Sequence, residues 1–192
     1  MPGLVGALTM LTRGAAIGGL VADLAGVTAS DRVLDVGCGP GSAARKAARR
    51  GAAVTGVDPA PLMLRIARYL SRRAAGGQLV FEEGTAEALP VSDRAVTVAW
   101  AISSAHHWPS LSAGLQEIYR VLEPGGRLLI AERLTRPGAR GLGAHGFTAA
   151  SAKDVIADAH TAGFADALYQ TQRAGRRTLI VISAHRPAAG TS

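Results

Sequence analysis

Two short stretches of this chain combine glycines and ionisable side chains at spacings that suit chemistry on a small molecule. The first reads VLDVGCGPG, from Val33 to Gly41, and places an acid two residues before three glycines spaced as GxGxG. Glycines let a ligand approach the backbone closely, and the start of a helix at this point is expected to expose backbone amides to it. The second reads SSAHHW and contains His106 and His107, which can exchange a proton near neutral pH.

A second acid, Asp58, ends the next apolar stretch after the glycine turn. In open α/β sheets a carboxylate at this place accepts hydrogen bonds from both ribose hydroxyls of a nucleotide cofactor. A glycine-rich turn also marks dinucleotide-binding folds, so a nicotinamide-dependent oxidoreductase is one reading. The GxGxG spacing, with Asp35 two residues before Gly37, opposes that reading.

The elements that must position these residues alternate between short apolar strands and helical stretches, which is typical of a parallel sheet covered on both faces. Two closely spaced β-type segments at the end indicate a hairpin that enters the sheet antiparallel. We therefore predict a doubly wound, Rossmann-like α/β sheet of seven strands. The expected strands are 33–36, 53–57, 79–82, 95–101, 127–134, 165–172 and 176–184, and the expected helices are 42–50, 61–73, 110–122 and 151–162.

The 192 residues suit one globular domain, with 48% apolar and 18% charged residues. We expect residues 1–30 to be a helical segment packed on the domain, 31–186 to form the domain, and 187–192 to be a flexible tail. The apolar run near the N-terminus is interrupted by Arg13 and Asp23, which argues against a membrane span and a signal peptide.

The net charge of +7 does not by itself select a partner. Only Lys46 and Lys153 are lysines, and all other basic residues are arginines. We interpret this excess of arginine as a bias in amino-acid composition and not as a binding surface, and we expect no nucleic-acid partner. Cys38 is the single cysteine, which excludes an intramolecular disulfide and a cysteine-only metal site. No metal site is predicted, and a cytoplasmic monomer or homodimer is expected.

Five stretches occur in a common order: VLDVGCGPG, VDPAPLML, EGTAEALP, SSAHHW and EIYRVLEPGGRLLIAE. Together they resemble the class I S-adenosylmethionine-dependent methyltransferases, in the branch of the ubiquinone- and menaquinone-biosynthesis enzymes. The resemblance covers roughly residues 20–185. It implies transfer of a methyl group from S-adenosylmethionine to an oxygen, nitrogen or carbon nucleophile of a small molecule.

The resemblance also implies which residues bind the cofactor. Asp35 and the glycine turn would hold its methionine portion, Asp58 its ribose, and the backbone amide of Ala86 its adenine. Pro59 and Met63 lie where the adenine is usually walled. The full implied set is Asp35, Gly37, Gly39, Gly41, Asp58, Pro59, Met63, Thr85, Ala86, Glu87 and Ile102.

The sequence departs from the family pattern at Thr85, where many relatives carry an aspartate that accepts from the adenine amino group. We expect Glu87 or water to take part of that contact, and the departure leaves room for a relative that binds the cofactor without catalysis. Thr97 replaces another common aspartate and is interpreted as structural.

His106 and His107 follow the fourth expected strand, at the edge of the sheet where ligands of open α/β folds bind. They are the candidate catalytic residues, because either could remove a proton from the acceptor. The alternative is that the pair caps the next helix and packs with Trp108, while Trp100 belongs to the core. The short connection RPGARGLGAHGFTA, with His145 and Phe147, is read either as part of a lid with the N-terminal segment or as a flexible surface loop.

Overall fold

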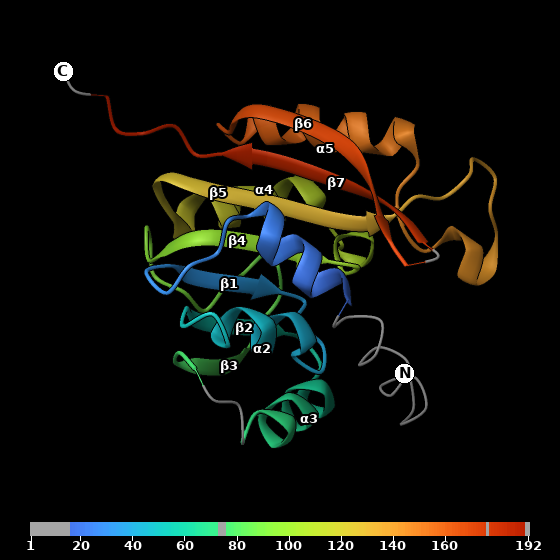
Figure 1. Cartoon of the computed structure of the whole chain (residues 1–192). Coiled ribbons are helices and arrows are strands. Elements are labelled where there is room, and N and C mark those ends of the chain that lie inside the picture. The colour runs from blue at the N-terminus through green and yellow to red at the C-terminus, as the bar shows by residue number, and fades with distance from the viewer. Residues whose placement is uncertain (1–15, 73–75, 176, 191–192) are drawn as a thin grey trace.

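A single mixed sheet of seven strands forms the centre of the protein, with helices on both faces (Figure 1). The computed structural model describes residues 16–72, 76–175 and 177–190. The strands are β1 Arg32–Val36, β2 Ala53–Asp58, β3 Leu79–Glu83, β4 Val96–Ile102, β5 Leu122–Arg133, β6 Ala165–Ala174 and β7 Arg177–His185. The helices are α2 Ser42–Ala48, α3 Pro61–Ser71, α4 Leu111–Val121 and α5 Ala149–Thr161, with short 3₁₀ turns η1 Ala105–His107 and η2 Gly141–Ala144.

The strand order is β3-β2-β1-β4-β5-β7-β6. The first five strands run parallel, and β7 pairs antiparallel with both β5 and β6. The predicted seven-stranded sheet and its antiparallel C-terminal strand are therefore confirmed. The chain moves outward from β1 to β3 and then returns to β4 beside β1, which creates the switch point where open α/β sheets bind ligands.

The predicted element boundaries agree with the structure to within one or two residues, except at the start of β5. We expected a break after α4 and a strand from 127, but β5 begins directly at Leu122, which pairs with Val96. The glycines of this stretch allow the register to shift here, and Gly125 adopts a φ of 82°. The N–H of Gly125 donates to the carbonyl of Arg186, so a residue just beyond β7 provides the hydrogen-bond partner for this irregular part of β5.

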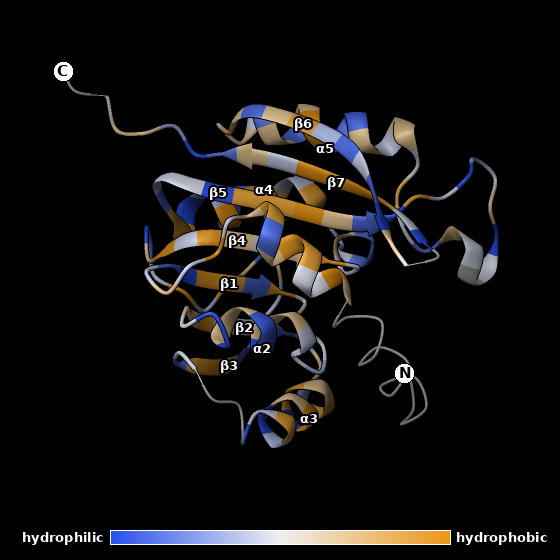
Figure 2. Cartoon of the chain, in the orientation of Figure 1, coloured by the Kyte–Doolittle hydropathy of each residue, from blue (hydrophilic) through white to orange (hydrophobic). Residues whose placement is uncertain are grey.

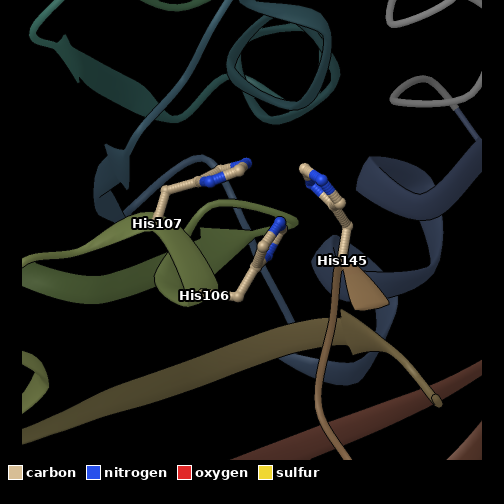
Figure 3. Close-up of side chains that lie close together, drawn as sticks. All are labelled: His106, His107 and His145. Atoms are coloured by element: carbon tan, nitrogen blue, oxygen red, sulfur yellow. The ribbon is translucent and has the colours of Figure 1, made fainter. Parts of the chain in front are cut away.

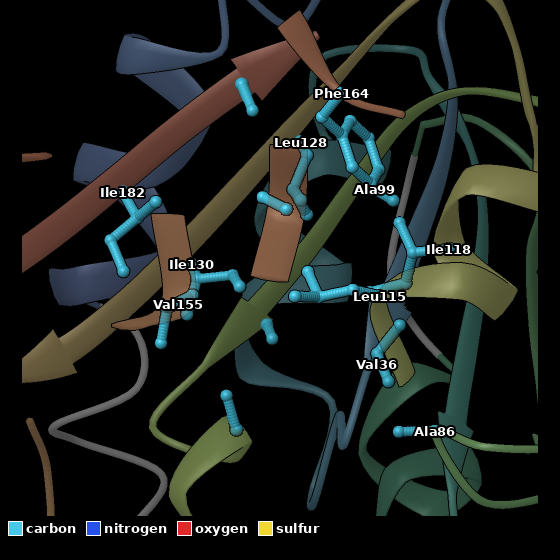
Figure 4. Packing of buried hydrophobic residues seen from close by; sticks show 14 of the residues in the cluster. Val36, Ala86, Ala99, Leu115, Ile118, Leu128, Ile130, Val155, Phe164 and Ile182 are labelled. Atoms are coloured by element: carbon cyan, nitrogen blue, oxygen red, sulfur yellow. The ribbon is translucent and has the colours of Figure 1, made fainter. Parts of the chain in front are cut away.

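Two layers of apolar side chains cover the two faces of the sheet. Figure 4 shows one of them, in which Leu115 and Ile118 of α4 and Val155 of α5 pack on β5. The other layer contains Trp100, which is fully buried, as expected for a core residue. In Figure 2 the central strands β4, β5 and β7 are coloured mostly as hydrophobic, whereas the helices alternate between hydrophobic and hydrophilic residues. The strands that carry the candidate site are therefore held from both sides.

Residues 16–24 form a helix that lies over the second layer, with Val21 fully buried. The rest of the segment predicted to pack on the domain, residues 1–15, lies outside the described residues. In the described part of the chain, no helix combines the length and the apolar character needed to cross a membrane.

Adjacent glycines in this helix give a direct test of its packing. A methyl group on Gly18 would lie 2.7 Å from Cα of Ala43 in α2, whereas no described atom lies within 4 Å of one on Gly19. We expect Gly18→Ala to lower the free energy of unfolding by about 1–3 kcal/mol through overpacking. Gly19→Ala should raise it by up to about 1 kcal/mol, because alanine favours helix. Urea denaturation measures both, and equal stabilisation by the two substitutions would contradict the contact with α2.

Candidate active site

The glycine turn between β1 and α2 has a backbone conformation that side chains disfavour. Gly37, Gly39 and Gly41 adopt φ angles of 70°, 52° and 74°. A methyl group on Gly37 would lie 2.4 Å from Cβ of Ser104, so packing also requires glycine there. At Gly39 no described atom lies within 4 Å of such a methyl group. The turn thus closes tightly at its first glycine and leaves open space at its second.

The amides of this turn are not free, which corrects the expectation that they would face a ligand. The N–H groups of Gly37 and Cys38 donate to the carbonyl of Val57, at 2.8 and 3.0 Å. The N–H of Gly39 donates to Oδ2 of Asp58 at 2.8 Å. The end of β2 runs beside the turn and takes these donors. What the turn offers a ligand is room beside its backbone rather than unpaired amides.

Asp58 is buried at the end of β2 and joins two loops. Its Oδ2 accepts from Gly39, and its Oδ1 accepts from the N–H of Ala60 at 2.9 Å. A carboxylate has about four acceptor sites, so each oxygen can still accept a further hydrogen bond. Nearby, Pro59 is exposed and Met63 of α3 is buried.

Asp35 lies on β1 and is almost completely buried, with 2% of its surface exposed. Burial, together with the charge of Asp58, raises the pKa of its carboxyl to about 7, although Trp100, the Ala44 backbone and Arg45 act in the opposite direction. Nevertheless, no described group hydrogen-bonds to Oδ2 of Asp35. A buried acceptor without a hydrogen bond is costly. Nε1 of Trp100, also buried and unpaired, is the protein donor near this carboxyl, and a donor group of a ligand would also suit the oxygen.

The segment from Thr85 to Glu87 follows β3, at the edge of the sheet where the parallel strands β1 and β2 also end. Thr85 is exposed, and the side chain of Ala86 is buried in the core. Glu87 accepts a hydrogen bond from the N–H of Ser110 at 3.2 Å, which ties one of its oxygens to the start of α4. Ile102 is partly buried at the end of β4 and packs on the second core layer.

The two predicted histidines lie in η1, directly after β4, and a third joins them. Nδ1 of His106 lies 2.8 Å from Oε2 of Glu132, a fully buried residue near the end of β5. The ring centroids of His106 and His107 are 3.9 Å apart, and that of His145 lies 5.4 and 5.3 Å from them. Figure 3 shows the three rings turned toward a common centre. Partial burial lowers the pKa of His107, and His106 and His145 lower it further, which favours the neutral imidazole.

The alternative role of the histidine pair as a helix cap is wrong. Ser110 is the N-cap of α4, and its side chain accepts from the N–H of Ala113. Trp108 packs against Gly114 of that helix. The histidines are therefore free of the capping role that the sequence allowed.

The connection after β5 that carries His145 is anchored at its base. Phe147 is buried, its N–H donates to the carbonyl of Arg133, and its own carbonyl accepts from the N–H of Thr135 at 2.8 Å. These bonds bring the end of the connection back to β5, while the described residues between Arg136 and His145 are mostly exposed. Of the N-terminal segment proposed as its partner in a lid, residues 16–24 form the helix over the second core layer, and residues 1–15 lie outside the described residues.

Residues 34–130 match the model of a family described as a methyltransferase domain, and this stretch is half of the chain. The chain belongs to this methyltransferase family. The resemblance to class I S-adenosylmethionine-dependent methyltransferases that the motifs indicated is thereby confirmed.

Two curated relatives illustrate the similarity. Demethylmenaquinone methyltransferase of Tropheryma whipplei strain Twist is 39% identical over 107 residues, which are 56% of this chain and 44% of that protein. The 27-O-demethylrifamycin SV methyltransferase of Amycolatopsis mediterranei is 37% identical over 116 residues, 59% of this chain and 43% of that protein. The chain thus matches less than half the length of either relative.

Solved structures share the fold at lower identity. The [4+2]-cyclase SpnF superposes with a TM-score of 0.77 and 23% identity, over 90% of this chain and 81% of that one. A SAM-dependent methyltransferase from Methanosarcina mazei gives a TM-score of 0.70 and 22% identity, over 88% and 98% of the chains. These two similarities show that the chain has the same fold as these proteins.

Sequence reasoning missed Glu132 and Ser104, and it treated His145 only as part of a loop. Glu132 lies in one of the quoted motifs, and an acid at the end of a strand beside the histidine strand was a usable signal. Ser104 donates to the carbonyl of Val36 at 2.7 Å, which joins the histidine turn to the end of β1. That contact depends on the pairing of β1 with β4, which local patterns do not specify.

Asp35 should make stability depend on pH. Its pKa of about 7 in the folded protein exceeds the reference value of 3.8, so the folded state binds more protons between these values and loses stability as pH rises through that range. Asp35→Asn removes this ionisation. The difference in free energy of unfolding between Asp35→Asn and the wild type should therefore be larger at about pH 8 than at about pH 5, by roughly 2 kcal/mol in favour of the variant. Urea denaturation across this range measures the difference, and a constant difference would show that Asp35 is not held protonated by burial.

Proposed function

We propose that this protein transfers a methyl group from S-adenosylmethionine to a small-molecule acceptor, at an oxygen, nitrogen or carbon nucleophile. The observation that carries the cofactor assignment is the buried Oδ2 of Asp35, which has no donor among the described residues and lies on the strand leading into the open glycine turn. A cationic donor such as an α-ammonium group fits that oxygen. Family membership supports the reaction class.

The remaining cofactor contacts follow the same assignment. Asp58 would accept from the ribose hydroxyls with the acceptor sites that Gly39 and Ala60 leave unused. Pro59 and Met63 would border the adenine. The rest of the proposed set is Gly37, Gly39, Gly41, Thr85, Ala86, Glu87 and Ile102. Since Glu87 already accepts from Ser110, its contribution to the adenine would come from its other oxygen.

The bound cofactor supplies an activated methyl group on a sulfonium. The protein's own task is then to hold the acceptor in line, exclude water and remove a proton where the nucleophile carries one. His106 and His107 are the proposed catalytic residues for that last step. Glu132 fixes the orientation of His106, and the surroundings of His107 favour its neutral form, which can accept a proton.

The names of the two relatives, demethylmenaquinone methyltransferase and 27-O-demethylrifamycin SV methyltransferase, support a small-molecule acceptor. The fold by itself does not select the reaction, because one structural neighbour is a [4+2]-cyclase. The oxidoreductase reading has no support in the family match, and the reading as a cofactor-binding protein without catalysis is tested by turnover. The single cysteine supports a cytosolic location.

Cofactor binding is the first test. S-adenosylhomocysteine should raise the melting temperature, since it binds the folded state, whereas NAD should not. Asp58→Ala should weaken S-adenosylhomocysteine binding by on the order of 2–3 kcal/mol, because it removes a charged acceptor and loosens the glycine turn. Asp58→Asn keeps one acceptor and should weaken it less. Calorimetry measures the affinities. Unchanged affinity in a folded Asp58→Ala protein would remove this residue from the site, and stabilisation by NAD alone would reject the proposed cofactor.

Turnover tests the histidines. Phenols, quinols and small carboxylic acids are screened as acceptors, with release of S-adenosylhomocysteine as the readout. The double variant His106→Gln, His107→Gln should lose about 10²–10⁴-fold in turnover while keeping its affinity for the cofactor. His185→Gln, at the distant end of β7, is the matched control. Full turnover in the double variant would assign catalysis to positioning alone.

A further inference from the structure

Three imidazoles from two separate segments, which follow β4 and β5, converge at one place. One ring nitrogen from each of His106, His107 and His145 can be chosen so that all three lie within 4.8 Å of one another. In the part of the chain that the structure describes, no other group of three such side chains is placed to share an ion. Figure 3 shows the rings facing inward from η1 and from the connection after β5.

The environment of His106 supplies an independent indication. Its Nδ1 is within hydrogen-bonding distance of the carboxylate of Glu132, which can only accept when ionised. In the neutral ring, Nδ1 then carries the hydrogen and Nε2 carries the lone pair. Nε2 is buried, and no described group donates to it. A carboxylate behind a histidine, with the opposite nitrogen left as a bare acceptor, is the arrangement that orients histidine ligands of metal ions.

We propose that His106, His107 and His145 bind a divalent transition-metal ion of the zinc type. Imidazole nitrogens suit zinc and its neighbours, and three protein ligands with an open fourth position characterise catalytic rather than structural zinc sites. Simple stacking of three rings would explain their proximity but not the bare, buried Nε2 of His106.

The distances require only a modest contraction. Nitrogens bound to one tetrahedral zinc at about 2.0–2.1 Å lie roughly 3.4 Å apart, which is shorter than the present upper limit of 4.8 Å. His107 and His145 are exposed and can rotate toward the centre, whereas His106 is held by Glu132. The site therefore combines one fixed ligand with two adjustable ones.

An ion at this place would narrow the class of acceptor, an extension that rests on the proposed function. A metal-bound hydroxyl group loses its proton near neutral pH, so the ion would favour phenols or enols. With the ion bound, His106 and His107 are ligands and no longer the proton acceptors of the proposed function, so the hydroxyl proton leaves to solvent as the O–CH₃ bond forms. The C–S bond of the donor breaks with its electron pair going to sulfur, and the products are a methyl ether and S-adenosylhomocysteine.

Metal binding is tested on the full chain after treatment with a chelator and dialysis. Titration with ZnCl₂ should give one bound equivalent, and Co²⁺ in its place should give the visible absorption of a tetrahedral site. Glu132→Gln should weaken zinc binding by about 10–100-fold, as for other residues that orient histidine ligands. His145→Gln, at an exposed position that should tolerate substitution, should weaken it at least about tenfold, while His185→Gln should not change it.

The same stripped protein is titrated with S-adenosylhomocysteine, so the two proposals can fail separately. Absence of zinc binding while S-adenosylhomocysteine still binds would overturn the metal site alone. Zinc binding that His145→Gln leaves unchanged would also overturn it, because the ion would then lie elsewhere. Zinc binding without S-adenosylhomocysteine binding would support the metal site and contradict the proposed function. Turnover of a phenol that is lost on stripping and regained with one equivalent of zinc would support the proposed acceptor class, and full turnover by the stripped protein would overturn it.

Discussion

The contact between Gly37 and Ser104 holds the ligand-binding edge of the sheet together. Ser104 donates to the carbonyl of Val36, and the N–H of Gly37 donates to the carbonyl of Val57, so the ends of β4, β1 and β2 are joined within two residues of chain. No side chain fits between Gly37 and Ser104. The proposed cofactor turn begins on one side of this contact and the histidine turn on the other. Their relative position therefore follows from backbone packing, which leaves the site little freedom to misalign.

Of the two acids of the site, Asp35 is placed at a cost to stability. Asp35 is buried with one oxygen unpartnered, and its raised pKa reflects the unfavourable burial of its charge. Asp58 avoids this cost because Gly39 and Ala60 donate to it. In the proposed site the two acids have different tasks: Asp58 maintains the turn, and the unpaired oxygen of Asp35 would accept from the ligand. Tight packing around β1 is what allows the fold to tolerate such a group.

The sequence predicted the features that depend on neighbouring residues. The strands, the antiparallel last strand and the acids at the ends of β1 and β2 follow from periodicity and from one short motif. The contacts across the sheet did not follow. The amides of the glycine turn are taken by Val57 and Asp58, and Glu132 reaches His106 across a separation of 26 residues. Such contacts arise because adjacent parallel strands end at the same edge, and which strands are adjacent is decided by the packing of the whole domain.

The candidate site has two halves that are built from different pairs of adjacent strands. The proposed cofactor half is made largely of backbone and of two acids, all near the ends of β1 and β2, so few substitutions there preserve it. The other half consists of side chains on the segments that follow β4 and β5, and its members meet only because those strands are paired. His145 joins the cluster from a connection that is anchored by Phe147 but otherwise lies at the surface. A change in the length of that connection would move one imidazole and leave Glu132 and His106 in place.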